Sequence, residues 1–198
     1  MTLYGNRQIL IFLLLVTFFA ACNNTGETAK NIEQKNFQST DSLTTPKTNV
    51  LTSNVAQHTF SDTYKKDTFK LTLSGSSILD GNLTFKIVDF NNAIIFSDTF
   101  PSSDLLNDQA DVIPTPKQKE DSILKRVRDF FNEKRFVQPA ITSTDPYDEE
   151  INCGRETWEN LIADATSIGF IYSHGYESSF GIVYSKRDKR VVQYFASD

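Results

Sequence analysis

The C-terminal half of the chain contains one cysteine and one histidine, Cys153 and His174, that could act together as nucleophile and base. A cysteine nucleophile needs a histidine within hydrogen-bond reach and usually a third group that orients it. Acidic residues beside Cys153 would raise the pKa of its thiol, and no recognised catalytic-cysteine pattern surrounds it. We therefore assign no catalytic residue and interpret Cys153 as a thiol that packs against Trp158 or faces solvent.

A second candidate is the acidic loop 145–150, which holds Asp145, Asp148, Glu149 and Glu150. Clustered carboxylates can ligate calcium through hard oxygen atoms. The loop lacks the alternating acids and central glycine of an EF-hand, and acids that precede a helix also favour its dipole. We therefore predict neither a metal nor a cofactor.

A third candidate is aromatic, since the chain has 16 Phe, 7 Tyr and 1 Trp. Tyr147, Trp158, Tyr172 and Tyr176 could form a surface on which a sugar ring stacks. Most of the phenylalanines fall at core-facing positions, so core packing is the simpler account of the surplus. The four residues remain a hypothesis for a ligand site.

The remaining cysteine, Cys22, follows a distinctive segment. Residues 1–21 contain one basic residue, Arg7, then an apolar run that ends in Ala20-Ala21. The run is shorter than the roughly 20 residues that cross a bilayer core. The layout is typical of an export signal. Cleavage by the ordinary secretory route, however, requires a small residue at position 19, which is the large Phe19.

A cysteine directly after the small-residue pair resembles the lipobox of bacterial lipoprotein precursors, although Leu is more usual than Phe19 three places upstream. The resemblance implies that residues 1–21 are removed and that Cys22 carries acyl chains such as palmitate. Stable anchoring takes more than one chain, and bacterial lipoproteins usually carry two or three. The alternative is a secreted protein with an incidental cysteine.

The residues after Cys22 bear on location. Asn23 replaces the Asp that retains proteobacterial lipoproteins at the inner membrane, so the resemblance implies the outer membrane, facing the periplasm, with the cell surface as the alternative. Residues 41–43 resemble the short acceptor of a periplasmic O-glycosylation system, which would modify Ser42. The signal, the polar tether and the ending from Tyr184 to Tyr194 together resemble lipoproteins common in Bacteroidota.

Composition restricts the partners. The formal net charge is −5, from 20 basic and 25 acidic residues. This charge disfavours nucleic acid as a partner, because nucleic-acid binding needs a basic face.

Residues 22–57 are interpreted as a lipidated cysteine followed by a disordered polar tether, because 19 of residues 23–57 are Asn, Gln, Ser or Thr and bury little apolar surface. Residues 58–198 are long enough for one globular domain.

Within that domain, apolar residues alternate over 69–73, 82–89 and 93–100, which predicts antiparallel strands. In the third strand, Ile94, Phe96 and Phe100 are expected to point inward. Thr115, Pro116 and Gln118 predict a helix start, followed by an apolar stripe through Ile123, Leu124, Val127, Phe130 and Phe131.

A shorter helix is expected over 155–165, and a three-stranded meander over 168–173, 180–185 and 190–195. The expected fold class is therefore α+β, an antiparallel sheet of hairpins and a C-terminal meander packed against one main amphipathic helix and a shorter second helix in two layers.

These features favour a lipid-anchored, non-enzymatic binding or assembly module whose partner is another envelope protein or a glycan. One alternative is a hydrolase that acts on envelope polymers or peptides. Another is an inhibitor or immunity-type lipoprotein, because an acidic chain suits a basic target. The sequence predicts contact with the membrane through lipid and none with nucleic acid.

Overall fold

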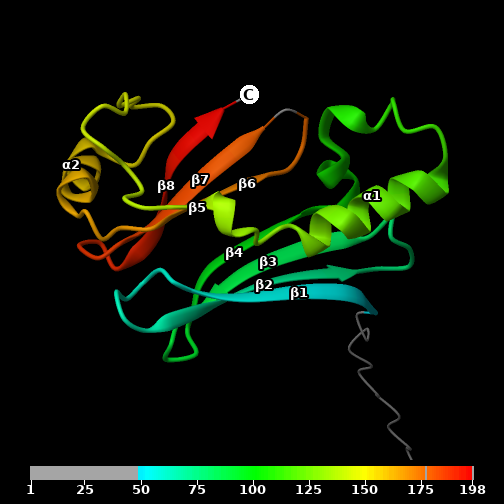
Figure 1. Ribbon diagram of the computed structural model, residues 1–198, viewed down its shortest axis with the longest axis horizontal. Coiled ribbons are helices and arrows are strands. Elements are labelled where there is room, and N and C mark those ends of the chain that lie inside the picture. Colours follow the sequence, from blue (N-terminus) through cyan, green and yellow to red (C-terminus); the bar gives the residue numbers. More distant parts are fainter. Residues whose placement is uncertain (1–48, 177, 198) are drawn as a thin grey trace, which may run out of the picture. The chain divides into compact units, whose positions relative to one another are not determined.

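A computed structural model of the chain describes residues 49–176 and 178–197 (Figure 1). These residues belong to the second of two units into which the chain divides, Thr44–Asp198. Cys22, Ser42 and the signal segment 1–21 lie outside the described residues. None of the helices in the described part of the chain is long and apolar enough to cross a membrane.

The first sheet is an antiparallel meander in the order β1-β2-β3-β4, comprising β1 (Val50–Thr59), β2 (Lys66–Ser74), β3 (Asn82–Val88) and β4 (Ile94–Pro101). In its two central strands, β2 and β3, buried residues alternate with more exposed ones, as predicted. Leu71 of β2 pairs with Phe85 of β3, and both are fully buried. Lys70 pairs with Lys86 on the opposite face. One face of this sheet is therefore apolar and the other polar.

The N-terminal strand β1 corrects the predicted domain boundary. Residues 50–57 were interpreted as tether, but they belong to an edge strand paired with β2, with one register shift between Val50 and Thr52. Only Leu51 and Ala56 pack against the core, so the apolar signal is weak. The Asn54 amide also donates to the carbonyls of Val127 and Arg128, at 2.8 and 3.0 Å, and so satisfies the end of the main helix.

A β-bulge in β4 reverses one prediction. The register of β3 and β4 shifts between Ile87 and Val88. The extra residue is Ile95, and it reverses the alternation on its N-terminal side relative to the rest of the strand. Ile94, expected to point inward, is 58% exposed. Ile95 packs against the core instead, whereas Phe96 packs against the core and Phe100 is buried, both as predicted.

The second sheet has the order β5-β6-β7-β8 and contains β5 (Phe136–Val137), β6 (Gly169–Ser173), β7 (Ser179–Ser185) and β8 (Arg190–Ser197). The last three strands are the predicted meander, and all neighbours are antiparallel. The two-residue strand β5 is too short to give a sequence signal. Its Phe136 ring stacks on His58 of β1 with the centroids 4.1 Å apart, which joins the two sheets.

The helices begin close to where the sequence places them. In α1 (Pro116–Arg128) the Thr115 hydroxyl accepts the Gln118 N–H at 3.3 Å, which is the predicted N-cap. The second helix, α2 (Arg155–Ala163), is two residues shorter than expected. Two 3₁₀ segments, η1 (Ser102–Gln109) and η2 (Glu133–Arg135), complete the described elements.

The second sheet and α1 lie over the same face of the first sheet (Figure 1). Apolar side chains from both sheets and from the α1 region form one core, in which Phe69, Phe85, Phe130 and Phe170 are fully buried. The opposite face of the second sheet carries Val183 and Val192, which pack with Trp158 and Leu161 of α2. The fold is α+β as predicted, with three layers rather than two.

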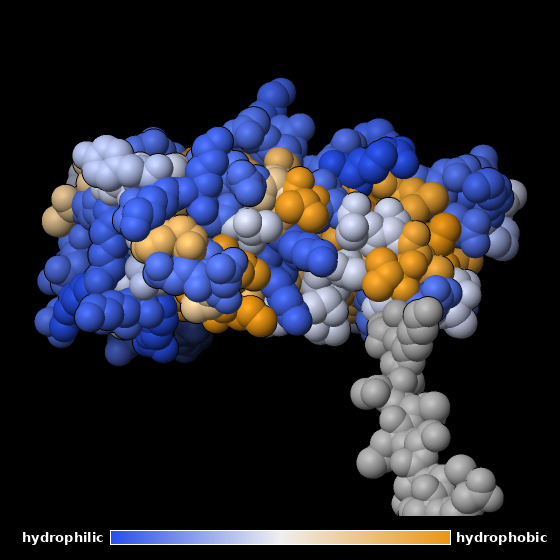
Figure 2. All heavy atoms as spheres, turned by 90° about the horizontal axis from the view of Figure 1, so that it is seen from below, coloured by the Kyte–Doolittle hydropathy of each residue, from blue (hydrophilic) through white to orange (hydrophobic). Residues whose placement is uncertain are grey.

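The surface seen in Figure 2 is mainly hydrophilic, with separate apolar patches. Among the described residues, Tyr64, Val112 and Tyr176 are the most exposed large apolar or aromatic side chains. Scattered exposure of this kind is usual in folded domains and needs no special explanation.

Candidate functional site

A pocket with a volume of about 580 Å³ lies between the outer face of the second sheet, α2 and the loop that precedes α2. Two of the four aromatic residues proposed for ligand binding, Tyr147 and Trp158, line it and touch edge to face with their centroids 5.6 Å apart. The other two, Tyr172 and Tyr176, lie elsewhere. The pocket therefore contains only part of the proposed set and is a candidate ligand site.

The lining of the pocket is mostly apolar. Strand residues and loop residues face each other across it, and the apolar ones are Val137, Pro139, Ala140, Pro146, Tyr147, Ile151, Trp158, Ile171, Tyr194, Phe195 and Ala196. Three polar residues complete the lining: Asp145, Asp148 and Asn152. All three come from one loop. A pocket of this composition suits a mainly apolar group with a few polar contacts.

The loop that closes the pocket is fastened to β8. The Asn152 amide donates to the Tyr194 carbonyl, and the Asn152 side-chain oxygen accepts the Asp148 N–H at 2.6 Å. The Cys153 N–H donates to the Gln193 carbonyl at 3.0 Å. Because these bonds need no ligand, the pocket is formed in advance, and the ordering cost of binding is small.

Tyr194 of β8 is buried beside the pocket without a partner for its hydroxyl. Its ring lies over Gly169 and Gly181, and a Cβ atom at Gly181 would stand 2.9 Å from the ring carbon Cζ. The two glycines therefore make room for the ring. Burial, with the Asp145 carboxylate nearby, raises the pKa of Tyr194 to about 12. A buried hydroxyl without a partner costs free energy, and nothing in the sequence indicates it.

The entrance to the pocket carries charge. Asp145 accepts the N–H and the hydroxyl of Thr142, at 2.6 and 2.8 Å. The Arg155 guanidinium lies 4.2 Å from the centre of the Tyr147 ring, a cation–π contact at the edge of the site. Within the described ranges, no group of three or more His, Cys, Asp or Glu side chains could hold a metal ion.

The two residues weighed as a catalytic pair do not meet. Cys153 packs against the Trp158 cluster, as one interpretation proposed, and burial raises the pKa of its thiol. His174 stacks on Phe100 of the main core, with the centroids 4.2 Å apart. No described contact joins Cys153 to His174, so this pair offers no activated nucleophile.

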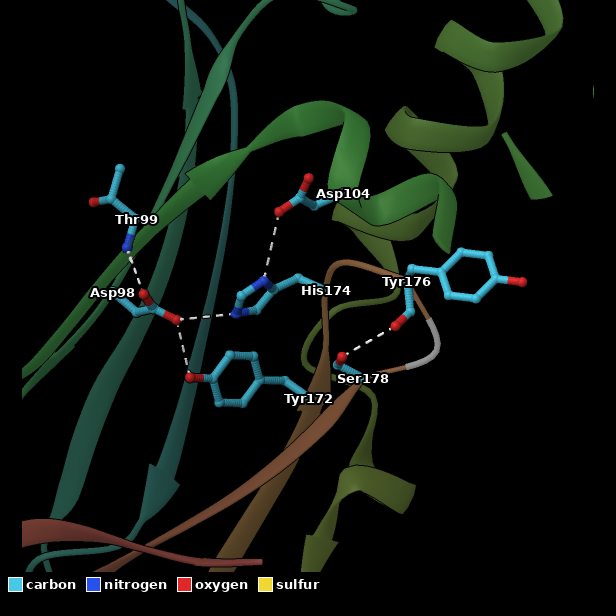
Figure 3. A network of polar contacts seen from close by, with 7 residues as sticks. All are labelled: Asp98, Thr99, Asp104, Tyr172, His174, Tyr176 and Ser178. Atoms are coloured by element: carbon cyan, nitrogen blue, oxygen red, sulfur yellow. Dashed lines mark hydrogen bonds and ion pairs between the residues drawn. The ribbon is translucent and has the colours of Figure 1, made fainter. Parts of the chain in front are cut away.

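His174 instead belongs to a polar network between β4, η1 and β6 (Figure 3). Its Nε2 lies 3.4 Å from an Asp98 oxygen and its Nδ1 lies 3.7 Å from an Asp104 oxygen. The buried Tyr172 hydroxyl donates to the same Asp98 oxygen at 3.0 Å. Tyr176 points away from these groups, and its side chain is exposed. The network ties the second sheet to β4.

Asp98 makes this network sensitive to acid. Its hydrogen bond with His174, aided by Tyr172, holds the pKa of the carboxyl below its usual value. A lowered folded-state pKa gives stability that is present above the unfolded pKa, near 4, and is lost as the pH falls through the folded value.

We expect Asp98→Asn to reduce the free energy of unfolding at pH 7 by about 1.5–3 kcal/mol, the range for hydrogen bonds to charged groups. The difference from the unaltered chain should shrink towards zero as the pH falls through the lowered folded-state pKa of Asp98, below which both chains carry a neutral group. Urea unfolding of both chains, from pH 7 down to acid pH, measures this difference in the free energy of unfolding. Asp111→Asn, at an exposed position, is the control, and an equal effect of both changes would contradict the assignment.

Comparisons of the chain with models of protein families, with curated protein sequences and with solved structures found no match.

Proposed function

We propose that the protein is a lipid-anchored binding module of the bacterial envelope, and that the pocket between β8, α2 and the loop 139–152 receives an apolar group of its partner. The pocket is the single observation that carries this proposal. It is large and mostly apolar, and its closing loop is held by hydrogen bonds to β8. These properties are those of a site prepared for a ligand.

The lining favours an apolar side chain of a protein over a glycan. A sugar presents hydroxyl groups around its ring, and each needs a hydrogen-bond partner when it is buried. The polar lining residues, Asp145, Asp148 and Asn152, come from one loop, whereas the floor on β6 and β8 is apolar. A glycan would therefore leave hydroxyls unpaired against that floor.

The hydrolase alternative receives less support. A nucleophilic mechanism needs a nucleophile within reach of a base. Cys153 and His174 pack in different clusters, and both ring nitrogens of His174 face carboxylates. Location in the envelope rests on the resemblance around Cys22, and anchoring at the outer membrane with the domain in the periplasm is part of the proposal.

The proposal is tested by titration of the full chain, held in lipid nanodiscs, with 4-phenylbutanol. Trp158 is the only tryptophan and lines the pocket, so its fluorescence reports occupancy. We expect a saturable change with the alcohol and none with a chito-oligosaccharide. The absence of a saturable response to either would contradict the proposal, and a response to the sugar alone would favour a glycan partner.

A further inference from the structure

A second, smaller cavity brings two arginines together. Arg126 of α1 and Arg135 of η2 line a space of about 120 Å³, about a fifth of the pocket volume, with Leu105, Asn107, Phe130 and Ser173. The cavity lies on a different set of residues from the pocket and plays no part in the function proposed above. Its volume admits only a compact group.

The two guanidinium groups are only partly engaged. Arg126 donates one N–H to the Leu105 carbonyl, and Arg135 lies over the Phe130 ring, 5.7 Å from its centre. A guanidinium has five N–H donors. Among the described residues, no carboxylate stands within ion-pair distance of either arginine. The remaining donors are available to a ligand.

The positive charge of the cavity is unfavourable without a ligand. Both arginines are half-buried. Burial, together with the nearby charge of Arg126, lowers the pKa of Arg135. Like charges held together away from water repel each other more strongly than they would in solution. An anion between them would replace that repulsion with attraction.

Asn107 provides a second, independent indication of a ligand site. Its side-chain oxygen is buried with no hydrogen-bond partner. Its backbone has φ 52° and ψ −132°, a conformation that interrupts η1 and that non-glycine residues rarely adopt. Strain of this kind persists where the surroundings hold a residue in place, often at ligand sites. An acceptor without a donor would be satisfied by a ligand that carries a hydroxyl.

We propose that Arg126, Arg135 and Asn107 form a site for a phosphate-type oxyanion, either free phosphate or a phosphate monoester. Planar guanidinium groups bind such oxygens through paired, charge-assisted hydrogen bonds. A protonated phosphate oxygen can also donate to the Asn107 oxygen. The hydroxyl of Ser173, which shares a 2.8 Å hydrogen bond with Ser179, completes the polar lining.

The test measures the melting temperature of the full chain in nanodiscs as a function of the concentration of inorganic phosphate, at constant ionic strength. A ligand that binds only the folded state raises the melting temperature saturably. We expect this rise in the unaltered chain and at least a tenfold loss of apparent affinity in Arg135→Gln, since a charge-assisted hydrogen bond is removed. Lys134→Gln, which removes the exposed neighbouring charge, should keep the response.

The melting temperature without phosphate distinguishes an arginine that binds a ligand from one that only stabilises the fold. Without phosphate, Arg135→Gln should melt at or above the temperature of the unaltered chain, because repulsion from Arg126 is relieved. A lower melting temperature without phosphate, a phosphate response retained in Arg135→Gln, or an equal loss in Lys134→Gln would overturn the site. A parallel titration with glycerol 3-phosphate identifies the source, because a stronger response than that to inorganic phosphate indicates a monoester and an equal or weaker one indicates free phosphate.

Discussion

Replacement of Phe85 by alanine is expected to remove about 3–5 kcal/mol from the free energy of unfolding, the range observed when a buried aromatic side chain is truncated. Phe85 is fully buried at the middle of β3. Its ring contacts six others, those of Phe69, Phe96, Phe130, Phe131, Phe170 and Tyr172. These rings come from both sheets and from the segment after α1, so one truncation loosens the contact between layers.

Such a loss is a large share of the 5–15 kcal/mol that a typical domain has. Equilibrium urea unfolding measures it. Phe90→Ala is the matched control, because the Phe90 ring is 37% exposed and its contact is the Lys65 ammonium at 4.0 Å. We expect the control to lose no more than about 1 kcal/mol. Similar losses in the two variants would contradict the central place of Phe85 in the core.

Ala196→Phe is expected to weaken 4-phenylbutanol binding at least tenfold. Ala196 of β8 lines the pocket, and a phenyl ring there would occupy part of the space that the ligand needs. Burial of such a ring contributes roughly 1.5–3 kcal/mol, and 1.4 kcal/mol corresponds to a factor of ten in affinity. The fluorescence of Trp158 follows the titration.

Ser97→Phe provides the control for this pocket-filling variant, since Ser97 is an exposed residue of β4 outside the pocket. It adds the same ring and should leave the affinity unchanged. It also corrects for partition of the alcohol into lipid, which affects both variants equally. Unchanged binding in Ala196→Phe would show that the alcohol binds elsewhere.

The elements with a strong local signal were predictable. In β2 and β3, buried leucine and phenylalanine alternate with threonine and lysine, so period and burial agree. The start of α1 was predictable from Thr115 and Pro116, because capping is a local interaction. Each of these predictions needs only residues that are close in the sequence.

Elements that depend on distant partners were missed. The strand β1 has little apolar content and is recognisable only from its pairing with β2 and the contact of Asn54 with α1. The outward direction of Ile94 follows from a bulge whose position the pairing with β3 decides. Packing of one sheet over the other is likewise a long-range result, and the sequence suggested only strands against a helix.

Only part of the candidate site was predictable, because its assembly also depends on contacts between residues that are distant in the sequence. Tyr147 and Trp158 were singled out as aromatic residues, but their separation from Tyr172 depends on which face of the second sheet each residue packs against. Tyr194 and its two glycines gave no signal, because glycine in a strand has several explanations. Arg126 and Arg135 are brought together by the turn that follows α1.

The most direct test of the account is intact mass analysis of the chain extracted from membranes, together with its N-terminal peptide. We expect the peptide to begin at Cys22 and to carry the mass of a diacylglyceryl group and an added acyl chain, and we expect Cys22→Ser to abolish both the lipid and membrane association. A chain that keeps residues 1–21, or a Cys22 without lipid in protein that still fractionates with membranes, would contradict it.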